Sequence, residues 1–108
     1  MKDDRVYVQH VLESIGKVEK FIAGNSYEDF VADEKTVSAV LHELMIIGEA
    51  ATCLSGQFRE HNPQIPFNEV IGMRNRIVHE YLAVRLETVW QTCKEDLPIL
   101  KKSLEEID

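Results

Sequence analysis

Cysteine is scarce in this sequence, which has only Cys53 and Cys93 among its 108 residues. Each stands at an apolar position of an expected helix, and neither belongs to a CxxC motif or has a histidine at metal-ligand spacing. We therefore expect both to be reduced residues of the core, and a disulfide between them is the alternative.

Long apolar runs are also missing, and their absence argues against a segment that spans a membrane. The N-terminus, Met1-Lys2-Asp3-Asp4-Arg5, carries mixed charges and leads into no apolar stretch of a secretion signal. These two absences predict a protein without membrane contact that is located in the cytoplasm.

Positive charge is in deficit, because 12 lysines and arginines stand against 19 aspartates and glutamates, for a formal net charge of −7. This balance argues against diffuse binding of nucleic acid, which needs a broad basic face. A polyanion would have to bind a local cluster, for which Arg74, Arg76 and Arg85 are the candidates. The acidic remainder favours a partner with a basic surface.

Several motifs that carry familiar chemistries are absent, including a Gly-rich phosphate loop, HExxH, GxSxG and an EF-hand loop. The histidines have no metal-ligand spacing among themselves, and the ExxH pair of di-metal bundles does not occur. We therefore expect neither a metal nor another cofactor.

Helical periodicity is what the sequence does contain. Apolar residues at spacings of three and four predict an amphipathic helix over roughly residues 3–23, and Gly24-Asn25 ends it. Ser26-Tyr27-Glu28-Asp29 has the form of a capping box that begins a single turn, with Phe30 against the core. Asp33 is a suitable N-cap for a second helix that reaches Leu54.

The second expected helix contains a patch of small residues, Gly48-Glu49-Ala50-Ala51, where another helix can approach closely. Glu49 is either an exposed charge or a partner for an arginine. Residues 56–66 are loop-like, and Pro66 suits the first turn of a third helix. The apolar face expected for that helix consists of Phe67, Val70, Ile71, Ile77 and Val78.

A nearly heptad-like spacing from Leu86 to Ile107 predicts a long fourth helix, which Pro98 should kink or divide after Asp96. No segment alternates with the period of a strand. We therefore predict an all-α fold, in which residues 1–108 form a single domain of four main helices in a bundle with short extra turns.

Most of the functional groups gather at residues 71–81, in the expected third helix. At about 100° per residue, Asn75 and His79 share one stripe of the helix, whereas Arg74 and His79 stand about 140° apart. The long arginine could curl around the helix, or a second copy across a twofold axis could complete the site. The spacing therefore hints at a site at a dimer seam, with Tyr81 at its rim if the helix continues that far.

An arginine and a histidine can in principle cleave RNA without a metal. Arginine holds a phosphate through two contacts, and histidine transfers a proton near neutral pH, so that the ribose 2′-hydroxyl attacks the phosphate. Structural roles are equally open for each residue taken singly. Arg76 and Glu80 would then form a surface ion pair, and Arg74 would be a buried cap or form a salt bridge across a dimer. His79 and Tyr81 would belong to the core. Asn75 would fix the tautomer of the His79 imidazole.

The motif Arg74-Asn75-x-x-x-His79-x-Tyr81 resembles the Arg-x4-His-x-Tyr motif of HEPN-domain ribonucleases. Further blocks extend the resemblance to the HepT-like toxin branch over nearly the whole chain. These blocks are Ile47-Gly48-Glu49-Ala50, Pro66, Ile71-Gly72-Met73-Arg74-Asn75, Val89-Trp90 and Asp96-Leu97-Pro98. Phe67 departs from the tryptophan that usually follows the breaker proline.

The resemblance implies a homodimeric HEPN-type bundle in which the two motifs line a shared cleft. It implies the toxin of a toxin–antitoxin system, a metal-independent endoribonuclease with Arg74 and His79 as catalytic residues and Asn75 in support. It also implies an MntA-like minimal nucleotidyltransferase as antitoxin, which attaches AMP to Tyr81. Apart from the resemblance, the local basic cluster makes Arg76 and Arg85 the candidates for contacts with RNA phosphates.

Two other functions stay open. The protein could be a non-catalytic helical dimer that binds a nucleotide or serves as the partner subunit of a nucleotidyltransferase, and the acidic net charge favours this alternative. A purely structural dimer would leave the clustering of functional groups at residues 71–81 unexplained.

Overall fold

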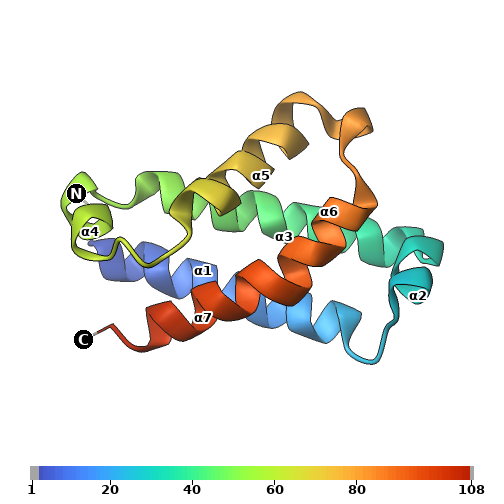
Figure 1. Ribbon diagram of the computed structural model, residues 1–108, viewed down its shortest axis with the longest axis horizontal. Helices are drawn as coiled ribbons and strands as arrows, with labels where there is room; N and C mark the ends of the chain where they lie inside the picture. Colours follow the sequence, from blue (N-terminus) through green and yellow to red (C-terminus); the bar gives the residue numbers. More distant parts are fainter. Residues whose placement is uncertain (1–2, 108) are drawn as a thin grey trace.

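The computed structural model describes residues 3–107, and within this range the chain forms helices and turns but no strand (Figure 1). This confirms the expected all-α class. The three long helices are α1 (Asp4–Ile22), α3 (Glu34–Cys53) and α5 (Phe67–His79). The shorter elements are α2 (Tyr27–Ala32), α4 (Gly56–His61), the 3-10 turn η1 (Tyr81–Ala83), α6 (Leu86–Gln91), the π-helical turn η2 (Thr92–Asp96) and α7 (Leu97–Glu105).

Helix α3 lies at the centre of the fold. It packs lengthwise against α1 on one side and against α5 on the other, while α7 lies against α1 (Figure 1). The residues that fill the space between these helices are those of the predicted apolar stripes, among them Ile15, Val18, Val40, Ile47 and Leu97. Their burial provides the main driving force for bringing the helices together.

By length and composition alone, α3 could cross a membrane, because it has 20 residues and its mean hydropathy reaches 1.2. The sequence-based argument from missing apolar runs is therefore weaker than expected. The apolar face of α3 is buried against α1 and α5, and even Glu43 on this helix is buried. This packing is that of a core helix, which is apolar for the same physical reason as a membrane span.

The predicted helix signals are confirmed where the structure describes them. Ser26 and Asp29 form the capping box of α2, and the Asp33 carboxylate accepts hydrogen bonds from the backbone N–H groups at the start of α3. Gly24 has a φ of 77°, a left-handed conformation that glycine adopts without steric cost, and this residue follows the end of α1.

The segment expected to be a loop contains helix α4. Its N-cap is Ser55, whose Oγ accepts a hydrogen bond from the Phe58 N–H at 3.0 Å. The Asp4 carboxylate in turn accepts hydrogen bonds from the N–H and the hydroxyl of Ser55, both at 2.8 Å. The start of α1 thus fixes the start of α4, a contact between residues too far apart for local sequence patterns to predict.

The last helix is divided after Asp96, as predicted from Pro98, but the division is a π-helical turn and not a break in the helix. The backbone N–H of Leu97 donates to the Thr92 carbonyl five residues back, so the helix widens into the turn η2 and continues as α7. Proline has no N–H, and its ring would clash with the carbonyl four residues earlier in a regular helix. A π-helical turn is one way to relieve that clash without ending the helix.

Two predicted core positions are wrong. Val78 is 44% exposed, and Cys53 is exposed at the end of α3. Cys93 is buried, and both cysteines are free thiols, as predicted. The helical spacing places Val78 near the apolar face of α5, but the side chain lies at the wall of an open pocket between α5 and α3 and is therefore only partly covered.

Candidate active site

Arg74 lies on the side of α5 that faces α3. Its Nη2 donates to the Glu49 carboxylate at 2.7 Å, and its Nη1 donates to the side-chain oxygen of Asn75 at 2.8 Å. The Arg74 side chain is 25% exposed and that of Glu49 is 58% exposed. The guanidinium is therefore held at both terminal nitrogens, while part of the side chain stays open to solvent.

Gly48 makes this arrangement possible. A methyl group at Gly48 would overlap Cβ of Arg74 and would lie 3.0 Å from the Val70 carbonyl oxygen. Because glycine has no side chain, α5 can approach α3 closely, and the stem of Arg74 lies directly on the α3 backbone. The small-residue patch predicted from the sequence is thus the surface against which the motif arginine packs.

Asn75 does not have the expected structural role. The sequence suggests that it fixes the His79 imidazole, but its side-chain oxygen accepts the hydrogen bond from Arg74. The sequence alone did not decide between two roles for Glu49, an exposed charge or the ion-pair partner of an arginine. Glu49 is an ion-pair partner of Arg74 and is also exposed.

His79 is the last residue of α5, and its side chain is exposed. The helix ends there because Glu80 leaves the helical conformation, with a φ of −138°, although its N–H still donates to the Arg76 carbonyl at 2.7 Å. Tyr81 consequently begins the turn η1 instead of extending α5. The helix therefore does not continue as far as Tyr81, which was the condition for placing this residue at the rim of the site from helical spacing.

Tyr81 lines a largely apolar pocket of about 450 Å³ between the end of α5 and the first half of α3. The other lining residues are Ser38, Leu41, His42, Met45, Ile77 and Val78. Tyr81 is 52% exposed and the adjoining Leu82 is 99% exposed. An apolar surface thus surrounds the motif tyrosine.

Arg76 and Arg85 lie together at a different place. Both line a small pocket of about 180 Å³ with Glu80, Ala83 and Val84. Arg76 stands about 200° around α5 from Arg74, so the two side chains point to opposite sides of the helix. Arg85 pairs with Glu87 at 3.5 Å, and the ion pairs among residues 3–107 do not include the expected one between Arg76 and Glu80.

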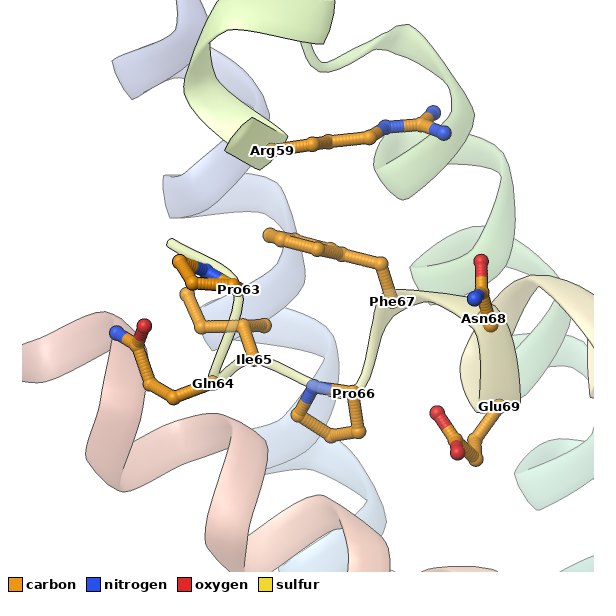
Figure 2. A pocket seen from close by; sticks show the side chains of 8 residues that line it. All are labelled: Arg59, Pro63, Gln64, Ile65, Pro66, Phe67, Asn68 and Glu69. Carbon is orange, nitrogen blue, oxygen red and sulfur yellow. The ribbon is translucent and has the colours of Figure 1, made fainter. Parts of the chain in front are cut away.

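A further pocket of about 460 Å³ lies where the chain passes from α4 to α5 (Figure 2). Figure 2 shows the Phe67 ring between Arg59 and the Pro63 to Ile65 segment. Arg59 is tied to the protein, because its Nη2 donates to the Ala51 carbonyl at 2.8 Å. The pocket contains none of the motif residues, and we do not assign the active site to it.

No cluster of three or more histidine, cysteine or acidic side chains suited to a metal ion occurs in residues 3–107. The chemistry available near the motif is that of an oriented guanidinium and an exposed imidazole at the end of the same helix. A guanidinium can bind a phosphate, and an imidazole can accept or donate a proton. These are the two functions that cleavage of RNA by its own 2′-hydroxyl requires.

Comparison with known proteins shows the family of the chain. The family described as ribonuclease HepT-like matches residues 11–107. A protein of Thermococcus cleftensis with the provisional name ribonuclease HepT is 38% identical over 101 residues, covering 94% of this chain and 92% of the relative.

Two further relatives carry provisional ribonuclease names. One from Caldanaerobacter subterraneus subsp. tengcongensis is 37% identical over 107 residues, covering 99% of this chain and 96% of its own. One from Methanocaldococcus jannaschii is 35% identical over 106 residues, covering 98% of this chain and 88% of the relative. No solved structure shows a significant match. The chain belongs to the HepT-like ribonuclease family.

Proposed function

We propose that this protein is a metal-independent endoribonuclease that acts in the cytoplasm as the toxin of a toxin–antitoxin pair. Arg74 binds the scissile phosphate and His79 accepts the proton of the ribose 2′-hydroxyl. The observation that carries the proposal is the arrangement of Arg74, whose partly exposed side chain is held by Glu49 and Asn75, in a chain of a ribonuclease family.

The reaction is a transesterification within the RNA. As His79 takes the proton, the 2′ oxygen forms a bond to phosphorus and the bond from phosphorus to the 5′ oxygen breaks. The leaving 5′ oxygen takes up a proton from solvent. The products are a 2′,3′-cyclic phosphate and a 5′-hydroxyl end, and DNA is not a substrate because it lacks the 2′-hydroxyl.

A homodimer is part of the proposal. Arg74 and His79 are five positions apart, about 7.5 Å along the helix and 140° around it, so one copy does not readily bring both heads to one phosphate. Val78, Tyr81 and Leu82 are apolar or aromatic side chains exposed beside the motif. A second copy that covers them would bring its own motif to the same cleft.

Regulation by modification of Tyr81 is also part of the proposal. An MntA-like nucleotidyltransferase would attach AMP to the hydroxyl of this residue, which is 52% exposed. The added phosphate is negative and the adenosine is bulky, so RNA would be excluded by charge and by volume. The exposed arginines Arg76 and Arg85 would contact RNA phosphates away from the cleavage point.

The experiment is RNA cleavage by the purified protein, free of AMP, with EDTA present. Wild type is compared with Arg74→Ala and His79→Ala, and mass spectrometry identifies the product ends. We expect cyclic phosphate ends from wild type and at least a hundredfold slower cleavage by both variants. Cleavage that persists in both variants would show a contaminant or another site.

Tyr81→Phe tests the regulatory part of the proposal. This variant should cleave RNA but should gain no mass on incubation with ATP and the nucleotidyltransferase. An AMP-sized mass increase in the variant would assign the modification to another residue.

A nucleotide-binding dimer without catalysis is the second candidate. The net charge of −7 and the largely apolar pocket beside Tyr81 favour it, because both disfavour a long RNA more than a single nucleotide. A folded dimer with unmodified Tyr81 that binds ATP but leaves RNA intact would support this function over the first.

A further inference from the structure

The bond between Glu49 and Arg74 joins two helices at the centre of the candidate site. The residues are 25 positions apart in the chain, and their charged groups meet at 2.7 Å. Asn75 holds the other terminal nitrogen of Arg74 at 2.8 Å. The guanidinium therefore has two anchors, one on α3 and one on its own helix.

Two anchors determine how the guanidinium is oriented. An arginine side chain is long and flexible, but here Gly48 lets its stem lie on α3 and the two hydrogen bonds fix the plane of the head. Each terminal nitrogen carries two N–H groups and uses one of them in these bonds. One donor therefore remains on each terminal nitrogen. These two donors are the number needed to hold a phosphate by two contacts.

Glu49 could instead compete with the phosphate for Arg74, since it carries the same sign of charge as the substrate. The Glu49 side chain is 58% exposed, so water weakens its ion pair with Arg74 and screens its repulsion of the phosphate. This exposure argues against competition as the main effect of Glu49. Orientation is not screened in this way, and small misplacements of a catalytic group slow a reaction strongly.

We propose that Glu49 is a positioning residue of the ribonuclease site, which orients the Arg74 guanidinium for the phosphate in the transition state. This inference rests on the proposed function and extends it to a residue outside the Arg74-to-Tyr81 motif. It predicts that Glu49 affects the rate of the chemical step more than the binding of RNA.

The test compares Glu49→Ala, Glu49→Gln and wild type in steady-state cleavage of a short RNA. Glu49→Ala should lower kcat about tenfold and change KM by less than about twofold, because positioning acts mainly in the transition state. Glu49→Gln keeps an oxygen that accepts the bond from Arg74, so it should restore kcat to within about threefold of wild type.

Glu19→Gln is the matched control. Glu19 on α1 forms a comparable exposed ion pair with Lys101 at 3.1 Å, and its substitution removes the same charge without touching Arg74. It should leave kcat and KM unchanged. A Glu49→Ala variant that cleaves as fast as wild type would overturn the proposal, and one that cleaves faster with a lower KM would in addition identify Glu49 as a competitor of RNA.

A measurement without RNA separates this inference from the proposed function. NMR exchange at the Arg74 guanidinium reports how freely it rotates, and we expect restrained rotation in wild type and in Glu49→Gln but free rotation in Glu49→Ala. Equal rotation in all three proteins would overturn the positioning role. If wild type cleaves no RNA, the proposed function fails, whereas the NMR result still decides whether Glu49 orients Arg74.

Discussion

Individual side chains in this protein depend on partners that are distant in sequence. Arg74 is oriented by Glu49, Ser55 is held by Asp4, and Lys101 pairs with Glu19. Each bond connects two helices at their exposed edges, where ion pairs contribute little to stability. Their importance therefore lies in geometry, and at Arg74 that geometry coincides with the motif.

The two cysteines make a prediction at the same scale. Cys53 is exposed and Cys93 is buried, so a thiol reagent should label one cysteine in the native protein and two after denaturation. Counting labelled thiols by mass spectrometry measures this directly. Rapid labelling of both in the native state would show that the turn η2, between α6 and α7, opens readily.

Burial also raises the pKa of the Cys93 thiol from 9.0 to about 12. The folded protein therefore keeps this thiol protonated, while the unfolded chain ionises it above pH 9. The stability associated with the neutral thiol is complete below pH 9 and is lost as the pH rises towards 12, by about 1.4 kcal/mol per unit.

Urea denaturation at pH 8 and pH 10 checks this sign. The unfolding free energy of wild type should fall by about 1 kcal/mol more than that of Cys93→Ala, which has no thiol to ionise. Equal declines in the two proteins would mean that Cys93 is solvated in the folded state.

Among the elements, the contact of α3 with α5 decides the geometry of the site. Gly48 lies directly under Arg74, whereas Gly16 in α1 has open space where a side chain would stand. The same substitution should therefore have opposite effects at the two positions.

Gly48→Ala should lower the unfolding free energy by about 2 kcal/mol, because the added methyl group pushes α5 away from α3. It should also reduce RNA cleavage, since Arg74 moves with α5. Gly16→Ala should raise stability by about 0.5 to 1 kcal/mol through the better helix propensity of alanine and leave cleavage unchanged. Thermal or urea denaturation beside the cleavage assay measures both effects. A Gly48→Ala protein as stable as wild type would contradict the close approach.

For the molecule as a whole, the separation of Arg74 and His79 on one helix leads to a prediction about the dimer. If each cleft takes its arginine from one copy and its histidine from the other, a mixed dimer of Arg74→Ala and His79→Ala contains one intact cleft. An equal mixture of the two inactive proteins should then recover about one quarter of wild-type activity, because half the dimers are mixed and each has one of two sites.

Purified variants are mixed, unfolded and refolded together, and then assayed for RNA cleavage beside each variant alone. The absence of any recovery, with mixed dimers demonstrated by native mass spectrometry, would place both residues of a site in one copy. Recovery without mixed dimers would point to contamination.

Much of the fold follows from the sequence by itself. The apolar stripes, the capping residues Ser26 and Asp33 and the stop at Gly24 were predicted and are present, because they depend on hydrogen bonds and spacings within a few residues. The motif and the family were likewise recognised from the sequence.

Only the tertiary structure decided the surroundings of the motif. It ends α5 at His79, turns Tyr81 out of the helix, exposes Val78 and gives Arg74 its partner Glu49. The physical reason is that these features depend on how closely α3 and α5 pack and where that packing stops. A local pattern specifies a helix and its faces, but the contacts between faces are fixed only when distant segments meet.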